Sequence, residues 1–195
     1  MRCFDFCYTV VNLNTTFSFV DYCIKNGKNY LKFRLFIIKV VSKLLLMLRF
    51  INANQHSKLR LRALKGIKSE ELRKFSKQFS LELERNINPE IFSILNSDKD
   101  RKVLVVSNAL DFVIRDFFRY MDIKCDVVGS RIDLDSLIFT GNYCLYLPDI
   151  GKVSALFRTH PNILISEFYT DDFIADGDLV NYSEVSYLVC EGHVV

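Results

Sequence analysis

The stretch VLVVSNALDFVIRDFFRY, residues 103–120, decides the fold of this chain. It opens with the apolar and mostly β-branched run VLVV, which predicts a strand that is covered on both faces. Ser107 and Asn108 end this strand, and a helical pattern follows over residues 109–120. A buried strand that leads directly into a helix is typical of a parallel βαβ unit.

Other apolar runs of strand length lie on both sides of this unit, at residues 1–11, 125–128, 163–165 and 186–190. Helical patterns separate the strands, which is the alternation expected of parallel βαβ units. We therefore expect an α/β fold built on a doubly wound parallel sheet.

The segment between the first strand and residue 103 shows only helical patterns, which predicts an inserted all-helical subdomain. The α/β core would hold residues 1–14 and 97–195, and the helical cap residues 15–96. Thr15 or Thr16 is a candidate N-cap for the first helix of the cap. The expected helices lie at residues 15–27, 28–49, 58–65, from 69 onward and 90–95, with polar turns at 52–57 and 97–102.

The charge of the chain divides along the same boundary. The sequence has 26 Lys and Arg against 23 Asp and Glu, a net charge of +3. Residues 24–102 hold 19 basic and 7 acidic residues, a balance of +12, whereas residues 103–195 hold 6 and 14, a balance of −8. The basic cap would face an anion or a membrane surface. Nucleic acid is not expected as a partner, because the aromatic residues are buried by pattern.

The six cysteines form no CxxC pair, so a zinc ribbon or a thioredoxin-like motif is unsupported. Asp5 interrupts the N-terminus, so no signal peptide is expected, and reduced thiols favour a cytoplasmic location. The apolar run at residues 35–50 contains Lys39 and Lys43 and is shorter than the roughly 20 residues of a membrane span. It predicts an amphipathic helix whose apolar face meets either protein or lipid, so a peripheral membrane location remains an alternative.

Polar residues follow three of the expected strands, where the carboxyl ends of parallel strands form one edge of a sheet. We expect these residues to converge there. Carboxylates from two strands repel each other unless a cation joins them, and oxygen ligands favour Mg²⁺. A hydroxyl, a helix N-terminus and a lysine suit a phosphate, so the sequence predicts phosphoryl transfer. The residues are Asp5, Cys7, Thr9, Ser107, Asn108, Asp171, Asp172, Asp176 and, at an expected helix start, Lys152.

These segments resemble, in order, the four motifs of the haloacid dehalogenase (HAD) superfamily. The ordered set spans nearly the whole chain, and VVGSRI and FTGN resemble segments of the phosphoserine-phosphatase-like subgroup. The resemblance implies a Rossmann-like core with a helical cap inserted after the first motif. The four segments are FDFCYTV at residues 4–10, VLVVSN at 103–108, GKV around Lys152 and FYTDDFIAD at 168–176.

The resemblance also implies the role of each residue on a small phosphorylated substrate. Asp5 would attack phosphorus and form an aspartyl-phosphate, and Lys152 would neutralise Asp5 and the transferring group. Ser107 and Asn108 would bind the phosphate. Mg²⁺ would be held by Asp5, by the backbone carbonyl of Cys7 and by acids of the fourth motif.

Cys7 departs from the family pattern, because it replaces the Asp that acts as general acid and base. Such proton transfer contributes about 10²–10⁴-fold, and a thiol with an ordinary pKa of about 8.5 is a poor substitute. Slow hydrolysis, phosphotransfer, a substrate with a good leaving group and lost catalysis remain open. The alternative function is a catalytically impaired HAD-like protein that binds a phosphorylated ligand or an anionic membrane surface.

The fourth motif and the cap leave two further assignments open. Asp172 and Asp176 keep the four-residue spacing of the two acids in the family's fourth motif, and this spacing favours them. The segment FYTD instead aligns Asp171 with the first of these acids in close relatives, so Asp171 is the rival for that role. Arg60 resembles the cap arginine that binds a substrate carboxylate, with Arg62 as its rival. Residue 14 is Asn where phosphoserine phosphatases carry Glu, which argues against phosphoserine as the substrate.

Overall fold

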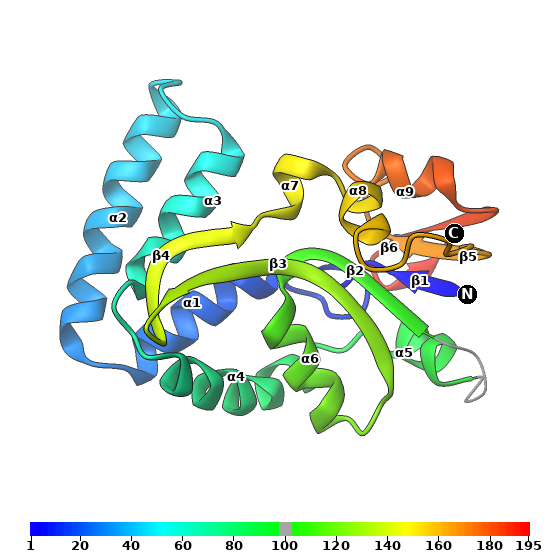
Figure 1. The fold of residues 1–195 in the computed structure, drawn as a ribbon, viewed down its shortest axis with the longest axis horizontal. Coiled ribbons are helices and arrows are strands. Elements are labelled where there is room, and N and C mark those ends of the chain that lie inside the picture. Colours follow the sequence, from blue (N-terminus) through cyan, green and yellow to red (C-terminus); the bar gives the residue numbers. More distant parts are fainter. Residues whose placement is uncertain (98–102) are drawn as a thin grey trace.

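The computed structural model describes residues 1–97 and 103–195, which form a seven-stranded sheet with helices on both faces (Figure 1). The strand order is β4-β3-β2-β1-β5-β6-β7. The strands are β1 (Arg2–Phe4), β2 (Val103–Leu110), β3 (Cys125–Asp135), β4 (Ile138–Leu145), β5 (Glu167–Thr170), β6 (Val185–Cys190) and β7 (His193–Val194).

The five inner strands, β3, β2, β1, β5 and β6, pair in parallel, and the edge strands β4 and β7 pair antiparallel to their neighbours. Helix α6 (Asp111–Tyr120) covers one face of the sheet. The other face is covered by α7 (Leu147–Ile150), α8 (Lys152–Phe157) and α9 (Gly177–Tyr182) (Figure 1). This arrangement confirms the predicted doubly wound α/β fold.

The apolar run of β2 supplies both cores of the molecule, because successive side chains of a strand point to opposite faces. Val103 and Val105 belong to the core under α6, whereas Leu104 and Val106 belong to the core under α8 and α9. A strand buried on both faces has no room for polar residues until it ends. For this reason the first polar side chain, Ser107, comes at the carboxyl end of the run.

Between β1 and β2 the described chain is helical. Phe19 of α1 contacts both Phe79 of α4 and Phe112 of α6, with ring centroids 5.7 and 5.6 Å apart. The inserted helices therefore share the core under α6, whereas α2 and α3 extend away from the sheet (Figure 1). The inserted elements are α1 (Thr15–Asn26), α2 (Asn29–Met47), α3 (Ala53–Leu61), a 3₁₀ turn (Arg62–Leu64), α4 (Ser69–Glu84) and α5 (Pro89–Asn96).

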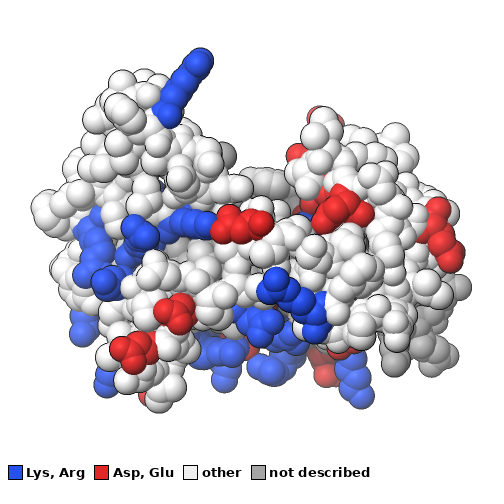
Figure 2. All heavy atoms as spheres, turned by 45° about the horizontal axis from the view of Figure 1, so that its top comes forward, with Lys and Arg blue, Asp and Glu red and all other residues white. Residues whose placement is uncertain are grey.

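Charge is unevenly spread over the surface. On the face drawn in Figure 2, Lys and Arg are concentrated over the left part and the lower edge, whereas Asp and Glu predominate toward the upper right. None of the described helices has the length and apolar character that would let it cross a bilayer.

The expected turn at residues 52–57 is wrong, because α3 begins there. Asn52 and Gln55 form a capping box, in which the side chain of each accepts the backbone N–H of the other at 2.9 Å. The first inserted helix also starts differently from the prediction. Its N-cap is Asn14, whose side chain accepts the N–H of Phe17, and not Thr15 or Thr16.

The strand expected at residues 163–165 is also wrong, since β5 lies at Glu167–Thr170. Ile163 and Ile165 are buried but do not belong to a strand of the sheet. The carbonyl of Ile163 accepts the hydroxyl of Tyr182, and the carbonyl of Ile165 accepts the N–H of Glu184. Strand β4 carries no clear apolar alternation and was not predicted. The turn expected at 97–102 lies, apart from Ser97, outside the described residues.

Candidate active site

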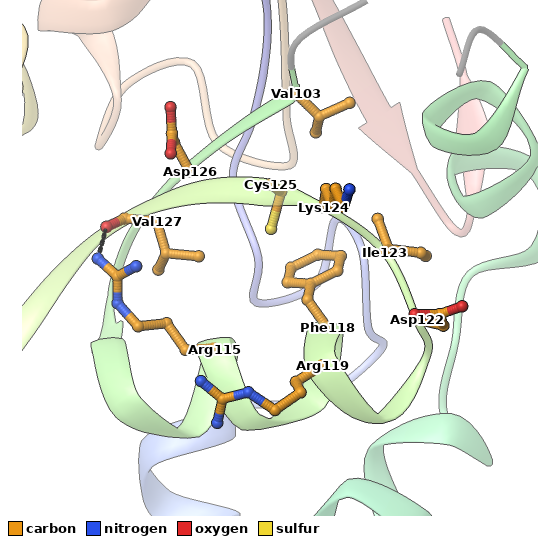
Figure 3. A pocket seen from close by; sticks show the side chains of 10 residues that line it. All are labelled: Val103, Arg115, Phe118, Arg119, Asp122, Ile123, Lys124, Cys125, Asp126 and Val127. Atoms are coloured by element: carbon orange, nitrogen blue, oxygen red, sulfur yellow. Dashed lines mark hydrogen bonds between the residues drawn. The ribbon is translucent and has the colours of Figure 1, made fainter. Parts of the chain in front are cut away.

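One cavity of about 590 Å³ does not hold the predicted residues. It lies between α6 and the start of β3, where Val103 and Cys125 mark the amino ends of their strands (Figure 3). The charged residues that line it are Arg115, Arg119, Asp122, Lys124 and Asp126. This cavity is therefore at the opposite edge of the sheet from the predicted site.

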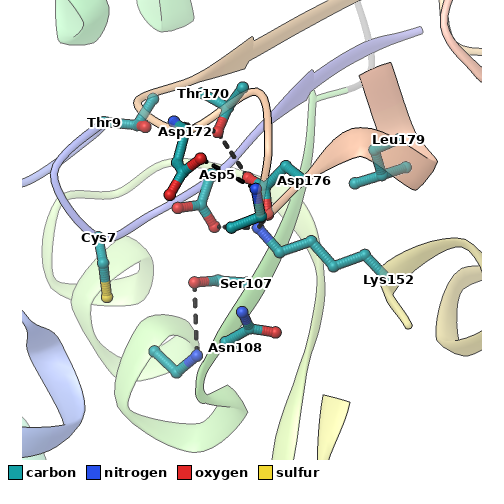
Figure 4. A network of polar contacts seen from close by, with 12 residues as sticks. Asp5, Cys7, Thr9, Ser107, Asn108, Lys152, Thr170, Asp172, Asp176 and Leu179 are labelled. Carbon is teal, nitrogen blue, oxygen red and sulfur yellow. Dashed lines mark hydrogen bonds and ion pairs between the residues drawn. The ribbon is translucent and has the colours of Figure 1, made fainter. Parts of the chain in front are cut away.

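The predicted residues meet at a smaller cavity of about 330 Å³ at the carboxyl ends of β1, β2 and β5 (Figure 4). This is the edge at which open α/β sheets bind their ligands. Asp5 directly follows β1 and donates its N–H to the carbonyl of Tyr169, which ties the ends of β1 and β5 together. The predicted residues that line the cavity are Asp5, Cys7, Ser107, Asn108, Lys152, Asp171, Asp172 and Asp176.

Lys152 is the centre of the polar network. Its Nζ donates to Asp5 Oδ1 at 2.8 Å and lies 2.6 Å from Asp176 Oδ1, and all three side chains are at most 8% exposed. Burial works against the charge on Lys152, but the carboxylates of Asp5 and Asp176 outweigh it and raise the pKa of the lysine. The ammonium is therefore held in its charged form beside Asp5.

Asp176 is fixed by two neighbours at once. The hydroxyl of Thr170, the last residue of β5, donates to Asp176 Oδ2 at 2.5 Å. The other carboxylate oxygen faces Lys152. Burial, followed by the charge of Asp5, raises the pKa of Asp176.

The two rivals for the first acid of the fourth motif lie in different surroundings. Asp171 Oδ1 accepts the hydroxyl of Thr9 at 3.4 Å, and burial and the charge of Asp5 raise the pKa of Asp171 to about 6. Asp172 Oδ1 instead accepts the N–H groups of Ile174 and Ala175, both at 2.9 Å. The geometry thus favours Asp171 as the acid that acts together with Asp5, and Asp172 as the residue that shapes the turn.

Ser107 and Asn108 lie where β2 departs from its regular register with β3. Ser107 is 1% exposed, and its Oγ accepts the N–H of Ala109 at 3.4 Å. The carbonyl of Asn108 accepts the hydroxyl of Ser130 at 2.9 Å. A serine hydroxyl that lines the cavity beside Asp5 is a suitable hydrogen-bond donor for a phosphoryl oxygen.

Cys7 lines the cavity as a neutral thiol. Its Sγ accepts the N–H of Thr15 at 3.4 Å. Burial, and then the charge of Asp5, raises the pKa of the Cys7 thiol to about 11. At neutral pH the thiol keeps its proton, so it is not a base that could activate water.

The cap arginines are placed apart from this cavity. Arg60 Nη2 donates to both carboxylate oxygens of Asp21, at 3.0 and 2.9 Å, and its guanidinium lies 4.1 Å from the ring centre of Phe17. Arg62 lines a neighbouring cavity of about 380 Å³, which shares the walls of Tyr143 and Tyr146 with the site.

Several residues of the site were missed by sequence reasoning. Thr170 could have been found, since it is the last residue before the acidic pair. Ser57 of α3 and the two tyrosines of the β4 region gave no signal, because only packing brings their segments to the strand ends. The missed lining residues are Tyr8, Thr16, Ser57, Ala109, Tyr143, Tyr146 and Ala175, whereas Asn14 lines the cavity at the position that the family resemblance places at the substrate.

The donor set fits a divalent cation in its chemistry. Asp5, Asp171 and Asp176 line the cavity together with a single lysine, and the negative charge of Asp5 adds to burial in raising the pKa values of Asp171 and Asp176. Carboxylate and carbonyl oxygens are the ligands that Mg²⁺ prefers. Within the part of the chain that the structure describes, no three or more His, Cys, Asp or Glu side chains stand in the arrangement of a metal centre.

A comparison with protein families identifies the family of this chain. The sequence profile of the haloacid dehalogenase-like hydrolases matches residues 3–174. The chain belongs to the haloacid dehalogenase-like hydrolase family. This confirms the family that the four ordered motifs predicted. A search of curated protein sequences finds no match.

Solved structures share the fold of this chain. A protein of unknown function from Bordetella pertussis Tohama I has a TM-score of 0.73 at 15% identity, covering 93% of this chain and 85% of that chain. A phosphoserine phosphohydrolase-like protein from Francisella tularensis subsp. tularensis SCHU S4 has a TM-score of 0.61 at 16% identity, covering 98% and 88%. Substrate-bound phosphoserine phosphatase has a TM-score of 0.52 at 16% identity, covering 95% and 83%. At these identities the likeness shows the fold alone.

Proposed function

We propose that this HAD-family chain is a Mg²⁺-dependent phosphomonoester hydrolase or phosphotransferase that acts through Asp5. The observation that carries the proposal is the contact of Lys152 Nζ with Asp5 Oδ1 at the carboxyl edge of the sheet. The lysine orients the carboxylate and leaves its second oxygen directed at a bound phosphate. A buried cation beside a buried carboxylate also supplies charge stabilisation for a transferring phosphoryl group.

In the first step Asp5 Oδ2 attacks phosphorus, so that an O–P bond forms to Asp5 while the bond from phosphorus to the ester oxygen breaks. Ser107 donates a hydrogen bond to a phosphoryl oxygen, and Lys152 stays protonated beside it. In the second step water, or another hydroxyl acceptor, attacks phosphorus, gives its proton to solvent and releases the Asp5 carboxylate. The ester oxygen that left in the first step takes its proton from solvent water. A bound Mg²⁺, held by Asp5, Asp171 and the carbonyl of Cys7, would supply further neutralisation of the phosphate charge.

Replacing Asp5 by Asn tests this proposal. We expect phosphate release from a generic ester such as p-nitrophenyl phosphate, with Mg²⁺, to fall at least about 10³-fold, because an amide is not a nucleophile. Asp122→Asn is the matched control, because Asp122 is an exposed residue with a positive φ that Asn also adopts. Unchanged release by a folded Asp5→Asn variant would contradict the proposal. If Asp5→Asn abolishes phosphate release, a screen of amino-acid, sugar, nucleotide and lipid phosphates with the wild type identifies the substrate.

The neutral thiol of Cys7 favours a second candidate function, a HAD-like protein that binds a phosphorylated ligand and turns it over very slowly. The attacking water lacks the usual base, because the pKa of Cys7 is about 11 and the thiol keeps its proton. The leaving oxygen lacks the usual carboxylic acid, because a thiol stands in place of the family's Asp.

Restoring the carboxylate distinguishes the two candidates. Cys7→Asp is expected to raise phosphate release by about 10²–10⁴-fold if only proton transfer limits the chain. Cys7→Ser, which restores no base, is the control and should stay near the wild-type rate. If both variants are folded and equally slow, loss of the general acid is not the main limit, and binding becomes the favoured function.

A further inference from the structure

Helix α2 presents an apolar stripe to solvent. Phe33, Ile37, Val40, Leu44 and Met47 recur at alternating steps of four and three residues, which places them along one side of the helix. The side chains of Phe33 and Met47 are 68% and 72% exposed. The opposite side, with Leu31, Leu35 and Ser42, is the one that packs into the protein. A continuous exposed stripe of this kind marks a surface that meets a partner.

The apolar surface continues beyond the end of α2. Leu48 and Phe50, in the turn that leads to α3, are 56% and 73% exposed. The α2–α3 hairpin extends away from the sheet, so its stripe and its turn lie on a projecting part of the molecule (Figure 1). A broad, flat partner can therefore reach the stripe without meeting the sheet.

The charges beside the stripe identify the chemistry of that partner. Lys32, Lys39 and Lys43 form the adjacent row of the helix surface, together with the exposed Phe36. Lys39 also pairs with Asp21 of α1 at 3.1 Å, which leaves Lys32 and Lys43 as the lysines tested below. No acidic residue occurs in α2, and none occurs between residues 22 and 69. A second copy packed on the same stripe would bring two basic helices together without an acid in either, which repulsion opposes.

We propose that α2 lies on an anionic lipid membrane. Its apolar stripe would enter the region between the headgroups and the acyl chains, and the lysine row would meet the lipid phosphates. Lysine side chains are long enough to keep their charge among the headgroups while their carbon chains lie along apolar surface. The proposal does not depend on the activity of the site.

Vesicle binding tests the proposal on the full chain. We expect the protein to sediment with vesicles of equal parts phosphatidylcholine and phosphatidylserine, and the bound fraction to fall as salt rises. Phe36→Ser with Val40→Ser should lower the partition coefficient at least about tenfold, because both side chains are exposed and would be buried in the lipid. The control Leu164→Ser with Val195→Ser removes exposed apolar groups at the other end of the molecule and should bind like wild type.

The lysine row is tested in the same assay. Lys32→Gln with Lys43→Gln should lower binding to the mixed vesicles about 30-fold. Lys74→Gln with Lys77→Gln, on the exposed side of α4, removes the same charge away from the stripe and should have a much smaller effect. An equal loss of vesicle binding in the two double lysine variants, or no binding by the wild type, would overturn the proposal. So would a dimer that Phe36→Ser with Val40→Ser converts to monomer, since the partner would then be a second copy.

Discussion

Lys152 binds two buried carboxylates that come from different strands, Asp5 after β1 and Asp176 after β5. The ion pairs satisfy the charges of all three groups inside the protein. The same contacts place the ammonium where the proposed reaction needs it. One residue therefore serves both the stability of the strand ends and the proposed chemistry, and the two roles are separable by experiment.

At the residue scale, we predict that Lys152→Met lowers the free energy of unfolding by about 3–5 kcal/mol at pH 7, because Asp5 and Asp176 lose their cation. Without the lysine, which lowers the pKa of Asp176 in the wild type, burial raises that pKa further above its value in the unfolded chain. The folded variant then binds more protons, so its stability falls as pH rises and the loss is smaller at pH 4. Urea unfolding of the wild type and the variant at pH 4 and pH 7 measures the loss of unfolding free energy.

The control for that measurement is Lys124→Met, which removes an exposed lysine and should change the unfolding free energy by less than about 0.5 kcal/mol. A Lys152→Met variant that loses the same stability at pH 4 and pH 7 would show that packing, and not the charge of the lysine, is what the substitution removes.

At the scale of elements, α3 shows how a polar segment becomes a helix. Residues 52–57 read as a turn because they hold no apolar periodicity, yet the capping box between Asn52 and Gln55 satisfies free N–H groups at the helix start. The consequence reaches the site, since Ser57 of this helix lines the cavity beside Asp5. A local cap thus positions a residue of the inserted segment against the sheet.

We predict that Asn52→Ala lowers the free energy of unfolding by about 1 kcal/mol and speeds amide exchange in α3, because the helix loses its N-cap. The matched control is Asn54→Ala. Asn54 is the second residue of the same helix, and its side chain is exposed. Alanine favours a helix interior, so this control should be neutral or slightly stabilising. Equal effects of the two substitutions would contradict a specific role for the cap.

At the scale of the whole molecule, the inserted helices and the sheet are joined by one hydrophobic core. Phe19 of α1 is fully buried between aromatic rings of α4 and α6. The basic half of the sequence therefore has two parts: α1 and α4 pack toward the sheet, and α2 and α3 project from it (Figure 1). This division explains why α2 keeps so much apolar surface exposed.

We predict that Phe19→Ala lowers the free energy of unfolding by about 3–5 kcal/mol and leaves a single transition. Far-UV circular dichroism and tyrosine fluorescence should change together in urea, because the inserted helices and the sheet share the side chain that is lost. Leu81→Ala, on the exposed side of α4, is the control and should have little effect. A helical signal that is lost before the tyrosine signal would show that the insertion unfolds alone.

Local sequence patterns were enough to predict the α/β class, most of the parallel strands and half of the residues that line the cavity at Asp5. Apolar runs and the polar residues that end them follow from local rules, because a strand buried on both faces excludes polar side chains until its carboxyl end. Tertiary structure decided the rest. Only packing between distant segments brought Ser57 and Tyr143 to the cavity, paired Arg60 with Asp21, and chose the environments of Asp171 and Asp172. Spacing cannot supply these contacts, since each depends on where other elements come to lie.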